Sequence, residues 1–258
     1  MTLLQVRSTS IRAGIVRAGI AGSLAFGLLG SMQPASVAAV DSTPGCAAER
    51  TAARANPTSV DGWKTAGYCE VDRRQVTITT LTSNVNGAST LTSADRSALL
   101  AILSADKSGL SSLRSQIAAD TTVAAVRADD QKVFEDFRIY ALVARQVHLV
   151  RGADLELAAV ARFGTVAEKL QARIDAAAQG GKDVTAAKAA LASMQAAVSK
   201  AQGLASPVSG KILPLTPAGF NAGSAKPVLD QARADLAAAR TQLIAARAAA
   251  RQVLAALK

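Results

Sequence analysis

The chain has 258 residues, of which 50% are hydrophobic and 3% aromatic, and it carries 29 Lys and Arg against 19 Asp and Glu. This length allows one large domain or two small ones. The shortage of aromatic residues argues against a cleft lined with sugar-binding platforms. Roughly a fifth of the residues are alanine, which favours helices while burying little area, so long and closely packed helices are expected.

Residues 1–39 are predicted to be an export signal. Three arginines without an acid precede an apolar run at 18–32, and the small residues at 36–39 predict cleavage after Ala38 or Ala39. The apolar run of about 15 residues is shorter than the roughly 20 of a spanning helix. We therefore expect a secreted or cell-envelope protein with no stable transmembrane helix after processing. An uncleaved anchor is the alternative.

Cys46 and Cys69 are the only cysteines, and an even number in an exported chain predicts one disulfide. Two separate thiols are the alternative. A disulfide closing a loop of about 24 residues would stabilise the fold by roughly 3 kcal/mol. Trp63 lies between the cysteines and is expected to pack over the disulfide, with ligand stacking as the alternative. Two cysteines and one histidine make a poor ligand set, so neither a metal site nor a cofactor is predicted.

Hydrophobic periodicity predicts helices from the start of the mature chain. A short helix is expected at 47–55, before Asn56-Pro57, and a longer one from Thr58 or Ser59 towards Val85. The β-branched segment 76–82 also fits a strand. Helix is preferred there, because the chain has no second strand of similar character to pair with.

The next helix is expected to begin at Thr92-Ser93-Ala94-Asp95, a sequence that resembles a capping box. Its residues recur at the spacing of a coiled-coil seam: Leu99, Leu103, Asp106, Leu110, Leu113 and Ile117. Asp106 is the only polar member. It either meets an arginine of a neighbouring helix and fixes the register, or lies at a wet edge.

The stretch Val133–Val150 contains a group of large or rare side chains: Phe134, Phe137, Tyr140 and the only histidine, His148. Asp120-Thr121-Thr122 is predicted to cap the helix that contains it, and Arg151-Gly152 to end or bend that helix. Apolar residues cover most of the circumference, which predicts a central helix contacted by more than one neighbour.

Two further helices are expected beyond this stretch, the first ending at Gly180-Gly181 and the second beginning at Asp183. A long loop at 203–224 follows, and its apolar side chains predict that it lies against the other helices. The last helix, 225–257, keeps a heptad rhythm over four repeats.

Arg233, Arg240 and Arg247 are spaced seven residues apart beside the seam of this last helix, with Arg251 further round. They form a basic stripe. One interpretation is a solvated flank whose methylene groups cover alanines. The other is a contact surface for an anionic cell-wall polymer or an acidic partner protein, consistent with a net charge of about +7 after removal of the signal.

Motifs for catalysis are missing: the chain has no nucleophile elbow, no phosphate-binding glycine loop and no zinc-protease motif. His148, with Glu135 and Asp136 upstream, fits a structural residue better than a proton-transfer residue. The prediction is therefore a protein that is not an enzyme. A secreted envelope-acting hydrolase using carboxylates or His148 is the alternative, and extracellular nucleic-acid binding through the basic stripe is a second one.

Several segments resemble a group of uncharacterised exported, alanine-rich, coiled-coil-like helical proteins of actinobacteria. The similarity lies in Leu91–Asp95, Ile117–Thr122, Phe137–Val143 and Leu215–Asn221. The resemblance implies secretion and an elongated helical fold, and it implies no activity. The cysteine pair departs from the commoner pattern of that group.

Together these observations predict one all-α domain at 40–258, an elongated antiparallel bundle of about five long helices with coiled-coil-like seams. Alanine-rich seams can close within one chain or between two copies, so an oligomer is an alternative. The predicted function is that of a non-catalytic structural or interaction module.

Overall fold

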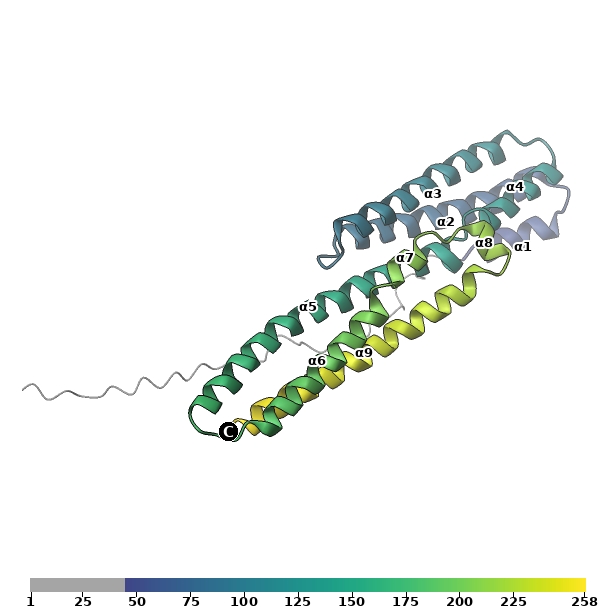
Figure 1. The fold of residues 1–258 in the computed structure, drawn as a ribbon. Helices are drawn as coiled ribbons and strands as arrows, with labels where there is room; N and C mark the ends of the chain where they lie inside the picture. The colour runs from purple at the N-terminus through teal and green to yellow at the C-terminus, as the bar shows by residue number, and fades with distance from the viewer. Residues whose placement is uncertain (1–44) are drawn as a thin grey trace, which may run out of the picture. The chain divides into compact units, whose positions relative to one another are not determined.

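The computed structural model describes residues 45–258, and this part of the chain is helical without a strand (Figure 1). The predicted export signal, 1–39, lies outside the described residues. The elements in chain order are α1 (Ala47–Ala55), α2 (Val60–Asn86), α3 (Ser93–Ala119), α4 (Val123–Glu135), the π-helix η1 (Ile139–Val143), α5 (Ala144–Gln179), α6 (Thr185–Ala205), α7 (Val208–Ile212), α8 (Pro217–Asn221) and α9 (Ala225–Ala256).

Side-chain caps begin three of these helices close to where the sequence predicts them. The hydroxyls of Ser59, Thr92 and Thr122 accept hydrogen bonds from backbone N–H groups three residues ahead, at 3.0, 3.1 and 3.2 Å. Each bond satisfies a donor that has no partner inside the helix. The predicted starts of α2, α3 and α4 are confirmed.

The β-branched segment 76–82 is helical, as expected, and lies within α2. Thr77, Thr79 and Thr80 donate their hydroxyl hydrogens to carbonyls one turn back at 2.9–3.1 Å, which gives these side chains partners inside a helix. Ile78 and Leu81 from the same segment are fully buried. Burial of the apolar side chains thus outweighs the β propensity of the segment.

Helices α1, α2, α3 and α4 form an N-terminal helix group, in which α2 packs against the other three. The seam predicted for α3 is buried at its five apolar positions: Leu99, Leu103, Leu110, Leu113 and Ile117. Their alternating steps of three and four residues keep them on one side of the helix, which faces the rest of the group.

The C-terminal helix group consists of α5, α6 and α9, with α6 and α9 in contact along much of their length. These two run in opposite directions, and Lys182 Nζ, just before α6, donates to the Leu257 carbonyl at 3.2 Å (Figure 1). Six alanines of α9 are buried, namely Ala225, Ala232, Ala239, Ala246, Ala249 and Ala250. Such small side chains let helix axes approach closely, so stability comes from many small contacts.

Helices α5 and α9 run in the same direction, since successive contacts between them keep an almost constant register. Arg145 pairs with Asp230, and Glu156 pairs with Arg240. Between these pairs, a Cβ atom added to Gly152 would lie 3.2 Å from Leu236 Cδ1. The glycine therefore gives Leu236 room at the α5–α9 contact.

The predicted helix end at Arg151-Gly152 is wrong, because α5 continues through both residues, while the alternative of a bend there stays a prediction. The interruption comes earlier: α4 ends at Glu135, and Arg138 has a left-handed backbone with φ 46° before η1 begins. The stretch Val133–Val150 is therefore divided among α4, a turn, η1 and α5.

Contacts from other helices account for the position of this interruption. Phe137 packs so closely on Gly109 of α3 that an added Cβ would lie 2.6 Å from its ring. Arg138 Nε donates to Asn221 Oδ1 at 2.5 Å, and Asn221 Nδ2 donates to the Glu135 carbonyl at 3.0 Å. The turn thus exchanges intrahelical bonds for bonds to α8.

The segment 203–224, predicted as a loop, contains the end of α6 and the short helices α7 and α8. It lies against α5, as its apolar residues predict. Gln146 Nε2 donates to the carbonyls of Ile212 and Leu215, both at 3.0 Å, and Val208 and Ile212 are buried. The two carbonyls thus have a protein partner in place of water, which attaches this segment to α5.

Candidate functional site

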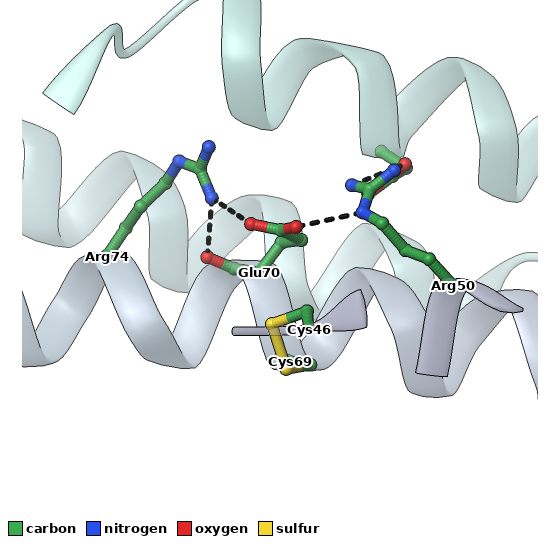
Figure 2. The surroundings of a disulfide bond; sticks show 6 residues. Cys46, Arg50, Cys69, Glu70 and Arg74 are labelled. Atoms are coloured by element: carbon green, nitrogen blue, oxygen red, sulfur yellow. Dashed lines mark hydrogen bonds and ion pairs between the residues drawn. A yellow bond between two sulfur atoms is a disulfide. The ribbon is translucent and has the colours of Figure 1, made fainter. Parts of the chain in front are cut away.

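Cys46 and Cys69 form a disulfide, as predicted, with a Cα–Cα separation of 5.8 Å (Figure 2). It joins the residue that precedes α1 to the middle of α2, and Cys46 is only 2% exposed. Trp63 Nε1 donates to the Pro57 carbonyl at 3.3 Å, and the Arg127 guanidinium lies 5.1 Å from the indole centroid. Packing of Trp63 over the disulfide stays a prediction.

Beside the disulfide lies a group of charged side chains that we call the Arg50 cluster: Arg50, Glu70, Arg74 and Asp130. Glu70 accepts from Arg50 Nε at 2.8 Å and from the Arg74 guanidinium at 2.6 Å, on its two different carboxylate oxygens (Figure 2). Arg50 also reaches Asp130 Oδ2 at 3.3 Å. The cluster connects α1, α2 and α4.

Burial and charge act in opposite directions on the two carboxylates of this cluster. Burial alone would raise the pKa of Glu70, but hydrogen bonds from Arg74 and Arg50 outweigh it and lower that pKa. For Asp130 burial prevails, and its pKa is raised despite the charge of Arg50. Two cations therefore face two acids, and Asp130 has the weaker compensation.

Aromatic rings lie against the guanidinium groups of the cluster. The Phe134 centroid lies 4.7 Å from the Arg50 guanidinium and 4.3 Å from that of Arg74. The Tyr140 centroid lies 5.3 Å from the Arg74 guanidinium, and its hydroxyl is 3.3 Å from that of Thr77. These contacts stabilise cations by the ring quadrupole. Because an arginine does not give up its proton, the arrangement suits ion pairing and packing better than proton transfer.

The Arg50 cluster was not predicted from the sequence. Two local signals were present, since Arg50 lies one turn after Cys46, and Glu70 follows Cys69 directly. A disulfide between those cysteines brings the two side chains together.

His148, the candidate catalytic residue of the hydrolase alternative, lies half-buried on α5. Burial, with a smaller contribution from the positive charge of Arg151, lowers its pKa. A cation next to an imidazole opposes protonation, whereas a catalytic base is commonly oriented by a carboxylate. These surroundings favour the neutral form of His148.

Asp106, the polar member of the α3 seam, is half-buried, and burial raises its pKa to about 6. Its Oδ2 is buried without a hydrogen-bond partner in the described part of the chain. The register-fixing arginine considered for this position is thus not observed as a partner of Oδ2. Asp106 is a carboxylate that the fold accommodates at a cost.

The basic stripe of α9 has members in different environments. Arg233 and Arg251 are exposed, whereas Arg247 is partly buried. Arg240 Nε donates to Glu156 Oε1 at 3.1 Å, and Glu156 is fully buried. Arg240 therefore neutralises a carboxylate of α5, while Arg233 and Arg251 face solvent.

The charge of the described chain is distributed unevenly along the sequence. Residues 45–155 carry thirteen Lys or Arg and twelve Asp or Glu, whereas residues 156–258 carry thirteen and six. Helix α6 contains Lys188 and Lys200 and no acid. Almost all of the excess positive charge thus belongs to the C-terminal half.

Cations of the N-terminal helix group are largely used in internal contacts. Arg96 donates to three carbonyls around the end of α2 at 2.6–2.7 Å, and Lys64 donates to the Ala118 carbonyl at the end of α3. Arg114 pairs with Asp72 at 3.1 Å. These cations complete helix ends and ion pairs, so they contribute less to binding outside partners.

Within residues 45–258, no helix has the length and apolarity needed to cross a membrane, and no group of three His, Cys, Asp or Glu side chains is placed to hold a metal ion. Comparison with protein-family models, with curated proteins and with solved structures finds no match to this chain.

Proposed function

We propose that the chain is an exported, non-catalytic interaction module of the cell envelope that contacts anionic wall polymers through its C-terminal half. In this proposal about five long helices form the bundle. The N-terminal helix group, closed by the disulfide, serves as the scaffold. The observation that carries the proposal is the concentration of excess positive charge in residues 156–258.

Physical reasons support placing the contact there. An anionic polymer is attracted most by cations that remain solvated and unpaired, since paired cations have little field left at the surface. Arg233 and Arg251 on α9, and Lys188 and Lys200 on α6, are exposed. Arg233 and Arg251 are 18 residues apart along α9, and Lys188 and Lys200 are 12 apart along α6. At about 1.5 Å per helical residue these separations are roughly 27 and 18 Å, which suits an extended polyanion better than a compact ligand.

The hydrolase alternative has less support. The buried acids are held in structural contacts: Glu70 by two arginines, Glu156 by Arg240, and Asp154 by the Thr92 backbone N–H at 2.7 Å. Proton transfer to a substrate needs an acid or base within hydrogen-bond reach of it. Because these buried carboxylates are held in structural contacts, few of them are free to exchange a proton with a substrate.

The test is binding of the purified protein to an envelope fraction from the producing cells at increasing salt. We expect R233Q/R251Q to weaken retention and flatten its salt dependence, because both side chains are solvated cations of the C-terminal half. The matched control R54Q/K107Q removes two exposed cations of the N-terminal group. Equal effects of the two double variants would contradict the proposed surface.

A second arm compares the wall polymer with duplex DNA at the same ionic strength. Stronger binding to DNA, lost in R233Q/R251Q, would replace the wall-polymer proposal with nucleic-acid binding. If retention of the protein on the envelope fraction does not change with salt concentration, a protein partner held by apolar contacts would be favoured instead.

A further inference from the structure

The junction of α1 with α2 contains two cross-links next to each other in sequence and in space. Cys46 is bonded to Cys69, and Arg50, one turn beyond Cys46, is paired with Glu70, the residue after Cys69 (Figure 2). The Arg50 backbone N–H donates to the Cys46 carbonyl at 3.1 Å. The position of the Arg50 side chain therefore depends on the same helical turn that the disulfide anchors.

Helix α1 has little else to hold it in place. It is nine residues long, and Ala53 is its only buried residue. Isolated helices shorter than about 12 residues are marginal in water, and a buried alanine adds little apolar area. The disulfide and Arg50 are thus the main attachments of α1.

Loss of Arg50 would change the charge balance inside the N-terminal helix group. Glu70 and Asp130 are 6% and 7% exposed, and Arg74 is the only other cation of the Arg50 cluster. Arg50 is the hydrogen-bond donor to Asp130 within the cluster. Without it, two buried acids would share one cation, and Asp130 on α4 would be the acid without a partner.

We propose that the disulfide and Arg50 form a redox latch. Reduction of Cys46–Cys69 releases α1 and moves Arg50 away from Glu70 and Asp130, and the packing of α4 on α2 then loosens. In the reduction, a dithiol transfers two electrons and two protons to the disulfide, which becomes two thiols while the dithiol forms its own disulfide. Oxidation by a disulfide-bearing oxidant after export reverses the step. The C-terminal helix group stays folded in both states.

Hydrogen exchange of the purified protein with and without dithiothreitol tests the latch. We expect exchange in α1, and in α4 around Asp130, to accelerate by about ten-fold or more on reduction, with exchange in the buried face of α9 unchanged. C46S/C69S should reproduce the reduced pattern in the absence of any reductant. Faster exchange confined to α1 would overturn the proposal, because the charge link to α4 would then be absent.

Two further variants test the charge link while the disulfide is intact. R50Q should accelerate exchange in α4, whereas R54Q, on the exposed side of α1, should leave it unchanged. D130N removes the buried carboxylate that would lose its cation on reduction, so dithiothreitol should loosen α4 less in D130N than in the parent. If D130N and the parent respond equally to reduction, the latch does not act through Asp130 and the proposal fails. None of these outcomes depends on whether the protein binds a wall polymer.

Discussion

Arg240 of α9 and Glu156 of α5 form an ion pair in which Nε lies 3.1 Å from Oε1, with the Glu156 side chain 1% exposed and the Arg240 side chain 39% exposed. Burial raises the pKa of Glu156, and Arg240 opposes that shift. Arg240 therefore compensates a buried charge, unlike the exposed Arg233 and Arg251 of the same stripe. Substitutions at Arg240 are expected to change stability, whereas substitutions at Arg233 or Arg251 test binding.

Replacing Arg240 with alanine should destabilise the protein, because it leaves a buried carboxylate without its cation. We expect the free energy of unfolding to fall by about 2 kcal/mol, below the usual loss for a fully buried pair because Arg240 is partly solvated. R233A, seven residues earlier and exposed, should stay within about 0.5 kcal/mol of the parent. Urea denaturation measures both.

The pairing itself is tested by a double-mutant cycle. In the background E156Q, where no buried charge remains, R240A should cost much less than in the parent. Equal costs in the two backgrounds would show that Arg240 acts through packing of its methylene groups instead.

Two helical glycines, Gly109 beside Phe137 and Gly164 in open space, test how tightly the Phe137 ring is packed. G109A should destabilise the protein by about 1–3 kcal/mol, because an added Cβ would lie 2.6 Å from the Phe137 ring and force it to move. G164A has nothing within 4 Å of its added Cβ and should stabilise α5 by about 0.5–1 kcal/mol. Thermal unfolding followed by circular dichroism compares the two. A stabilised G109A would mean that the ring relocates freely.

Features that depend on local sequence were predictable. Caps at Ser59, Thr92 and Thr122 and the heptad spacing of α3 follow from interactions within a few residues, and the structure confirms them. The disulfide was predictable because the chain contains only two cysteines. Each of these predictions required no knowledge of how distant helices pack.

Features that depend on distant contacts were missed. The interruption at Arg138 requires Asn221, 83 residues later, and Phe137 requires the slot at Gly109. Gly152 indicates a helix end in isolation, yet it serves close packing against Leu236. Periodicity places residues on a helix face but does not say which partner that face meets.

The sole histidine allows a direct check of its surroundings. His148 should titrate below the ordinary imidazole pKa of 6.5, since burial and Arg151 disfavour its charged form. A depressed histidine pKa means that the unfolded chain binds the proton more tightly, so this group lowers stability as pH falls below about 6.5. Two-dimensional NMR of the imidazole gives the pKa, and H148Q should remove this part of the acid sensitivity. A pKa above 6.5 would indicate a carboxylate partner and would reopen a catalytic role.

Asp106 should produce the opposite pH dependence. Its pKa is raised from 3.8 to about 6, so the folded state binds the proton more tightly than the unfolded chain. Stability associated with Asp106 is therefore greatest below about pH 4 and is lost as pH rises towards 6. D106N cannot ionise and should be more stable than the parent at pH 7.5 by about 1 kcal/mol, a value reduced from the full shift because the side chain is half solvated. Urea denaturation at several pH values should show this advantage shrinking as the pH falls to about 4. An advantage that persists unchanged at low pH would show that the amide makes a new hydrogen bond, and that the cost at this seam position does not come from the buried charge.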